Sequence, residues 1–231
     1  MPPRFGSRMT RGEIIAALLY LPVHLWLLPT LLFSLPETAS LSELDINTVV
    51  FVFGAVWMLV LEGRFLRRDF DPLCDAPGFC LLQILIHYGM LFGCNLLLGI
   101  LFRLLPVGAN PNNDAVVDMA LAQYGRTAAL AVFLAPLVEE PLFRGGIFHL
   151  LLKKNRLLAY AGSMLLFSLY HVWSYALQEP VYWLFILQYL PASWLLCRCY
   201  ERCGSIWGSI FLHMLINAVS VSALTTLAEA R

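Results

Sequence analysis

The sequence predicts an all-α protein, a polytopic transmembrane helical bundle of about seven spans, and two observations carry this prediction. Of the 231 residues, 60% are apolar and 13% are charged, whereas soluble domains are roughly 45–50% apolar and about 25% charged. The apolar residues are also gathered into stretches near the ~20 residues that a helix needs to cross a bilayer. This composition excludes a soluble globular enzyme and a disordered chain.

Seven apolar stretches are the expected spans, and they cover residues 14–35, 46–62, 79–105, 127–152, 157–177, 180–200 and 204–228. Their length favours helices, and the alternation in segments of about ten residues that is typical of a membrane barrel is missing. Together they need roughly 140 residues, which leaves only short loops. We divide the chain into an N-terminal part with three spans and loops (1–126) and a C-terminal core of four spans (127–231).

The basic residues predict the orientation in the membrane. Eleven of the 15 lie before the first span or after the second, fourth and sixth: Arg4, Arg8, Arg11, Arg64, Arg67, Arg68, Lys153, Lys154, Arg156, Arg198 and Arg202. The positive-inside rule then places the N-terminus in the cytoplasm and the C-terminus outside. Such a chain suits a bacterial inner membrane. The net charge is zero, so nothing indicates nucleic-acid binding.

Three spans carry polar groups that are costly at bilayer depth and that by default mark function. These groups are Glu139, Glu140 and Arg144 on the fourth span, His171 on the fifth, and His213 and Asn217 on the seventh. At about 1.5 Å per residue, Glu139, His171 and Asn217 each lie roughly 21–22 Å from the basic residues at the cytoplasmic end of their span, and His213 lies about 16 Å from it. A common depth is what a shared buried site requires.

Helical spacing assigns faces to these groups. Glu140 and Arg144 stand at i and i+4, so we expect a structural ion pair. Glu139 is rotated by about 100° from Glu140 and is free to meet another partner. His213 and Asn217 are also four residues apart and point the same way.

Neighbouring residues add further expectations. Pro136 and Pro141 flank the acids, so we expect a kinked helix with backbone carbonyls freed near them. Phe167 stands one turn before His171 and is expected to pack beneath it. The other histidines, His24, His87 and His149, are assigned to packing.

A carboxylate and an imidazole around a water molecule make a general base that can activate the water toward a carbonyl carbon. A second imidazole and a carboxamide can donate hydrogen bonds to the developing oxyanion. The sequence contains neither G-x-S-x-G nor H-E-x-x-H. Hydrolysis without a covalent intermediate is the economical interpretation, and we expect no cofactor and no resident metal.

Three motifs resemble those of the CAAX-protease and bacteriocin-processing family. Residues 139–144 fit its EExxxR motif, residues 167–171 fit FxxxH and residues 213–217 fit HxxxN, in family order and each on an expected span. The resemblance covers about residues 127–228. It implies that the C-terminal four spans form a CAAX-protease-like catalytic core, and that the protein is a glutamic-type intramembrane endopeptidase.

The resemblance also implies roles. By that similarity Glu139 and His171 activate the water, His213 and Asn217 stabilise the oxyanion, and the ion-paired residues of the first motif, Glu140 and Arg144, support the site. The implied partner is a membrane-anchored or membrane-inserted protein or peptide. Relatives process prenylated CAAX tails, leader peptides or C-terminal sorting helices, and the sequence leaves these three open.

Two alternatives stay open at this point. The first is a zinc metalloprotease with Glu139, His171 and His213 as ligands, since two histidines and one carboxylate form a known catalytic zinc set. The second is a transporter or scaffold that uses the buried polar cluster for protons or for a partner, although the inverted repeats typical of transporters are not evident.

Overall fold

The computed structural model describes residues 9–38, 40–105 and 107–230, and this part of the chain is helical without a β-strand. Within it, seven helical runs are long and apolar enough to cross a membrane: Arg11–Ser34, Glu43–Leu61, Pro77–Leu104, Pro111–Leu152, Arg156–Ala176, Pro180–Cys203 and Ile206–Glu229. The predicted fold class is confirmed, and the protein is an integral membrane protein.

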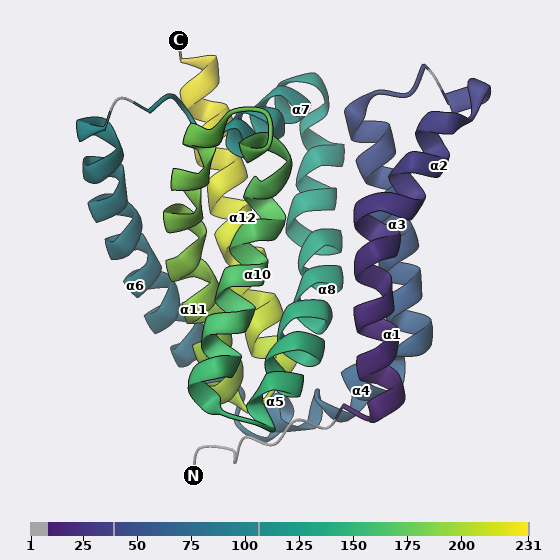
Figure 1. The fold of residues 1–231 in the computed structure, drawn as a ribbon. Helices are drawn as coiled ribbons and strands as arrows, with labels where there is room; N and C mark the ends of the chain where they lie inside the picture. Colours follow the sequence, from purple (N-terminus) through teal and green to yellow (C-terminus); the bar gives the residue numbers. More distant parts are fainter. Residues whose placement is uncertain (1–8, 39, 106, 231) are drawn as a thin grey trace.

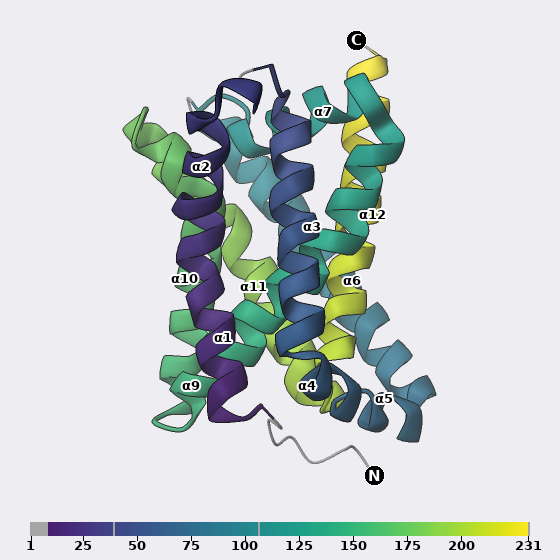
Figure 2. The same cartoon turned by 90° about the vertical axis from the view of Figure 1, so that its right-hand side faces the viewer.

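The N-terminal part flanks one side of the bundle (Figures 1 and 2). It consists of α1 (Arg11–Pro22), the π-helical η1 (Val23–Leu27), α2 (Leu28–Ser34), the short 3-10 turn η2 (Pro36–Thr38) and α3 (Glu43–Leu61). Capping boxes start both long helices, with Thr10 before α1 and Ser42 before α3. Trp57 on α3 donates a hydrogen bond to the carbonyl of Ala16 on α1 (3.1 Å) and ties these helices together.

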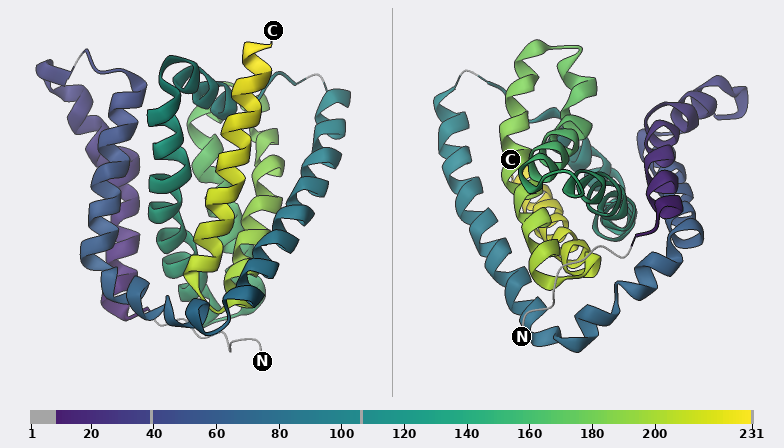
Figure 3. Two further views of the ribbon diagram at one scale, coloured as in Figure 1. Left: turned by 180° about the vertical axis from the view of Figure 1, so that it is seen from behind. Right: turned by 60° about the horizontal axis from the view of Figure 1, so that its bottom comes forward.

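Two short helices, α4 (Gly63–Arg68) and α5 (Asp71–Asp75), cross beneath the core to the long helix α6 (Pro77–Leu104) on its other side (Figure 3). Trp207 Nε1 donates to the carbonyl of Leu66 (2.8 Å), which fastens this crossing to the core. Near the same end, buried Cys80 on α6 lies against buried Cys203, with a sulfur-to-carbonyl contact of 3.8 Å. All six cysteines are free.

The remaining helices form the core between these flanks (Figure 1). They are α7 (Pro111–Ala128), η3 (Ala129–Leu134), α8 (Ala135–Glu140), η4 (Pro141–Phe148), α9 (His149–Leu152), α10 (Arg156–Ala176), η5 (Pro180–Phe185), α11 (Ile186–Cys203) and α12 (Ile206–Glu229). η3 and η4 are π-helical turns inside one run that stretches from α7 to α9.

The fourth span begins earlier than the expected residue 127. Helix α7 starts at Pro111, with Asn110 as its N-cap, and bends at Gln123, where φ is −150° and ψ is 77°. The first turns of α7 contain too few apolar residues to be predicted as part of a membrane span. A capping asparagine followed by proline is nevertheless a strong signal for the start of a helix. The backbone is not helical at Gln123, so α7 consists of two helices joined at a kink, and the division that we placed at 126/127 lies just after that kink.

The prolines of the fourth span coincide with its π-helical turns. Pro136 follows η3 and Pro141 opens η4. A proline has no N–H to donate to the carbonyl four residues earlier. The N–H of the residue after the proline can donate to that carbonyl instead, which makes a wider, π-helical turn. The widened turns lie on both sides of Glu139 and Glu140.

Glu62, at the junction of α3 and α4, is a fully buried carboxyl whose two oxygens have no hydrogen-bond partner among the residues that the structure describes. Burial, and next the nearby Glu13 carboxylate, raise the pKa of Glu62 to about 8. Because the folded state then holds a proton that the unfolded state releases near its ordinary pKa, folding stability falls as pH rises from about 4.5 to about 8.

We therefore expect Glu62→Gln, which keeps the shape without the charge, to stabilise the protein at pH 8 by roughly 1–3 kcal/mol more than at pH 5. The measurement is the free energy of unfolding in detergent micelles at both pH values. An equal effect at the two pH values would contradict the proposed burial of a neutral carboxyl.

Candidate active site

The polar side chains predicted to share a site line one cavity of about 1200 Å³. Residues of η1, α2, α3, α6, α7, η3, α8, α10, η5, α11 and α12 line it, and they include Glu139, His171, His213 and Asn217. Glu139 and His213 are each only 5% exposed, whereas His171 and Asn217 are half-buried. Three helices that are far apart in the sequence thus bring their polar groups together, as the common depth predicted.

The Glu139 carboxylate is the centre of this group. Its Oε2 atom lies 4.0 Å from Nε2 of His171 and 3.8 Å from Nε2 of His213. These gaps are too long for direct hydrogen bonds, and Oε2 has no such partner in the described part of the chain. The space suits a water molecule that is hydrogen-bonded to the carboxylate and to an imidazole at once.

The hydrogen bonds of the other ring nitrogens fix where the imidazoles carry hydrogen. His171 Nδ1 lies 2.9 Å from the carbonyl of Phe167, which can only accept, so Nδ1 carries the hydrogen. The Nε2 atom of a neutral His171 then presents a lone pair toward Glu139. His213 Nδ1 lies 2.7 Å from the Glu140 carboxylate and likewise donates.

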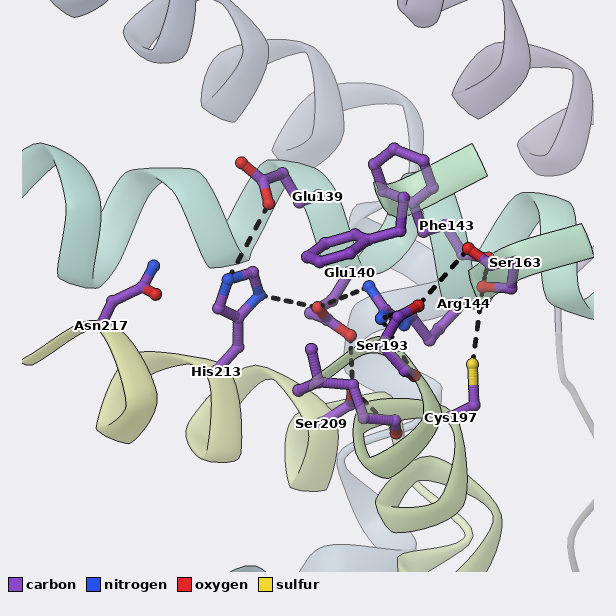
Figure 4. Close-up of polar contacts among 12 residues, drawn as sticks. Glu139, Glu140, Phe143, Arg144, Ser163, Ser193, Cys197, Ser209, His213 and Asn217 are labelled. Atoms are coloured by element: carbon purple, nitrogen blue, oxygen red, sulfur yellow. Dashed lines mark hydrogen bonds and ion pairs between the residues drawn. The ribbon is translucent and has the colours of Figure 1, made fainter. Parts of the chain in front are cut away.

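Behind the histidine, Glu140 and Arg144 form the expected ion pair, at 3.0 Å and with both side chains fully buried (Figure 4). Arg144 Nη2 also donates to the hydroxyl of Ser193 on α11 (3.0 Å). The Ser209 hydroxyl on α12 donates to the second oxygen of Glu140. The pair therefore connects the fourth span to the sixth and the seventh.

The Phe167 ring contacts two of the predicted site residues. Its ring packs under the His171 ring, with centroids 4.5 Å apart, as expected. The Arg144 guanidinium lies 4.3 Å from the same ring centroid, in a cation–π contact. Arg144 Nε has no hydrogen-bond acceptor in the described chain.

Asn217 lies one turn after His213 on α12 (Figure 4). Its Nδ2 atom donates a hydrogen bond to the carbonyl of Ala131, 2.7 Å away. In η3 the N–H of Ala135 bonds to Leu130, five residues back, so the next donor to Ala131 would be Pro136, which has none. Asn217 satisfies this freed carbonyl with one amide hydrogen and keeps a second.

Two residues around the site were not singled out from the sequence. The Tyr189 ring on α11 stacks on His171, with centroids 4.6 Å apart and an interplanar angle of 21°. Tyr170, adjacent in sequence to His171, hydrogen-bonds through its hydroxyl to His24 Nε2 (2.6 Å). His24, assigned to packing, thus joins the N-terminal helices to the core. No spacing rule connects residues so far apart in sequence.

Comparison with known proteins agrees with this geometry. Residues 123–219 match the sequence model of a family described as type II CAAX prenyl endopeptidase Rce1-like. The chain is also similar to the UPF0177 protein YvdC of Lactococcus lactis subsp. lactis (strain IL1403), with 24% identity over 206 residues, 83% of this chain and 74% of that protein. The family prediction is confirmed. Over residues 123–219 the chain is similar to the CAAX-protease family. No solved structure matches it.

The family match spans the three CAAX-protease motifs and the cavity floor that they build. The family match implies a protease, and the seven apolar helical runs imply membrane-associated substrates. The matched region begins at residue 123, at the bend of α7, close to the expected start of the core.

The geometry also bears on the zinc alternative. Zinc ligand atoms lie about 2.0–2.2 Å from the metal, so they stand roughly 3.3–3.5 Å apart in a tetrahedral site. The two nitrogen-to-oxygen distances at Glu139, 4.0 and 3.8 Å, are wider than this. Within the described residues no group of three or more His, Cys, Asp or Glu side chains is arranged to hold a metal ion.

The ion pair of Glu140 and Arg144 has a testable role in stability. We expect Arg144→Met to lower the free energy of unfolding by about 3–5 kcal/mol, because it leaves the buried Glu140 carboxylate without its cation. Unfolding titrations in mixed micelles measure this. Adding Glu140→Gln should recover a large part of the loss, since a neutral amide needs no counter-charge. A single variant as stable as the parent chain would contradict the structural role.

Proposed function

We propose that this chain is a glutamic-type intramembrane endopeptidase that hydrolyses a peptide bond with a water molecule held between Glu139 and His171. One observation carries the proposal: an acid and two imidazoles from three separate spans meet within 4.0 Å at the floor of a single cavity. The family match supports a peptide bond as the target.

In the first step the water oxygen attacks the carbonyl carbon of the substrate. Glu139 Oε2, which accepts no hydrogen bond from the described residues, takes a proton from the water. His171 Nε2 accepts the second hydrogen of that water through its lone pair and so aims the oxygen at the carbonyl. The Phe167 carbonyl keeps the imidazole in the required tautomer.

In the second step the negative charge that develops on the substrate oxygen needs donors. In the proposed scheme His213 acts as an imidazolium that donates from Nε2 to this oxygen, while its Nδ1 keeps the hydrogen bond to the Glu140 carboxylate. The second amide hydrogen of Asn217 is the other donor. Collapse of the tetrahedral intermediate breaks the C–N bond, and Glu139 returns the proton to the leaving amine.

The cavity suggests which substrates reach the site. Its lining includes Leu41, Glu43 and the residues that begin α7. These residues lie at the ends of the helices that are opposite the arginine-rich connections. With the N-terminus in the cytoplasm, as the basic residues predict, this is the outer side of a bacterial inner membrane. We propose a membrane-inserted substrate whose scissile bond lies in the outer half of the bilayer, such as a leader peptide or a C-terminal sorting helix.

The test compares the N- and C-termini of membrane proteins in cells that make the parent chain or its Glu139→Gln variant. We expect a set of termini that Glu139→Gln removes, with at least a 100-fold loss of cleavage for the purified protein, because the variant keeps the shape of the side chain but cannot take the proton. Glu43→Gln, an acid that lines the same cavity away from the histidines, is the matched control and should cleave normally.

The alternatives give different outcomes in the same experiment. Loss of cleavage after chelation, with recovery on adding zinc, would replace the water-activation scheme with the zinc metalloprotease. Normal cleavage by both Glu139→Gln and His171→Gln would remove the catalytic assignment and favour a scaffold or transporter.

A further inference from the structure

Four polar side chains gather beside His171 on the wall of the otherwise largely apolar cavity. They are Asn110, Asn112, Gln188 and Tyr189, which we call the main-chain shelf, and all four line the cavity. The first two come from the start of α7 and the others from α11. The mechanism described above does not use them.

The hydrogen bonds fix the orientation of the amides. Asn110 Oδ1 accepts the backbone N–H of Asn112 as the cap of α7 (3.0 Å), so its Nδ2 is the atom that faces α11. That Nδ2 donates to Gln188 Oε1 (2.8 Å) and to the Tyr189 oxygen (3.1 Å). Asn112 Nδ2 donates to the same phenol oxygen (3.0 Å).

This arrangement leaves specific groups unused. The Tyr189 oxygen accepts two hydrogen bonds, and amide nitrogens cannot accept, so its own O–H must donate elsewhere. Gln188 is held by its oxygen and keeps its amide hydrogens, while Asn112 is held by its nitrogen and keeps its oxygen. In the described chain no residue pairs with these three groups. The shelf therefore offers both donors and an acceptor to the cavity.

Donors and acceptors side by side are what a peptide backbone requires. In the apolar part of a bilayer each helix hydrogen bond that is broken leaves an N–H and a C=O that must find partners. A peptide bond inside a helix must be exposed before water can attack it, so the substrate has to unwind locally. The shelf adjoins His171, because the Tyr189 ring stacks on the His171 ring. Consecutive residues of an extended chain are about 3.3–3.6 Å apart, so a segment bound to the shelf is only a few residues from the scissile bond.

We propose that the main-chain shelf binds the backbone of the substrate segment that unwinds next to the scissile bond. Tyr189 and Gln188 donate to its carbonyls, and Asn112 accepts from one of its N–H groups. The site recognises unwound peptide and is indifferent to side-chain identity. This inference rests on the proposed function, because it assumes that the cavity receives a polypeptide.

The test measures binding to the Glu139→Gln protein, which should not cleave. The probes are two synthetic transmembrane peptides in vesicles of phosphatidylethanolamine and phosphatidylglycerol: one of Leu and Ala throughout, the other with Gly–Gly in its outer third to favour unwinding. Energy transfer to a dye on Cys74, an exposed cysteine, reports binding. The test variant adds Tyr189→Phe and Gln188→Leu. Tyr182→Phe, in a half-buried tyrosine of the same span away from the cavity lining, is the control.

We expect the Gly–Gly peptide to bind roughly tenfold more tightly than the Leu–Ala peptide, as two hydrogen bonds would provide. The shelf variant should lose this preference and the Tyr182→Phe control should keep it. Tyr189→Phe preserves the stack on His171, and thermal unfolding checks that the variants fold. The proposal is overturned if the shelf variant keeps the preference or if the parent shows none. Cleavage of either peptide by Glu139→Gln, seen by mass spectrometry, would instead sink the proposed function.

Discussion

The buried pair of Glu140 and Arg144 is the interaction on which the rest of the core depends. Two charges taken out of water cost several kcal/mol each unless their hydrogen-bonding groups are occupied. Here the occupants come from three other helices: Ser193 on α11, Ser209 and His213 on α12, and the Phe167 ring on α10. Because its partners lie on three other helices, the pair constrains the register in which the histidines meet Glu139.

A second constraint comes from the proline next to the acids. The carbonyl that Pro136 leaves free at Ala131 is taken up by Asn217, so a defect in one helix becomes a contact with another. The same carboxamide is a proposed oxyanion donor. The Asn217 side chain therefore links the irregular backbone of the fourth span to the geometry of the proposed active site. This link helps the fourth span, which Pro136 and Pro141 interrupt, to hold the site in place.

Much of this architecture could be predicted because the membrane makes polarity expensive. Apolar length gave the spans, and the depth of Glu139, His171 and His213 indicated that they meet, as the structure finds. Helix α7 could not be placed in this way, since its first turns are polar and resemble a loop. Contacts such as that of Tyr170 with His24, 146 positions apart, depend on how apolar faces pack, and spans that are apolar all round carry little information about their facing sides.

Asn110 performs two tasks with one side chain: its oxygen starts α7 and its nitrogen orients Gln188 and Tyr189. A residue with both tasks is hard to exchange, because any replacement would weaken a secondary-structure element together with recognition. Gln188 does not also cap a helix. Position 188 should therefore tolerate more kinds of side chain than position 110, which stays restricted to side chains that can still cap a helix.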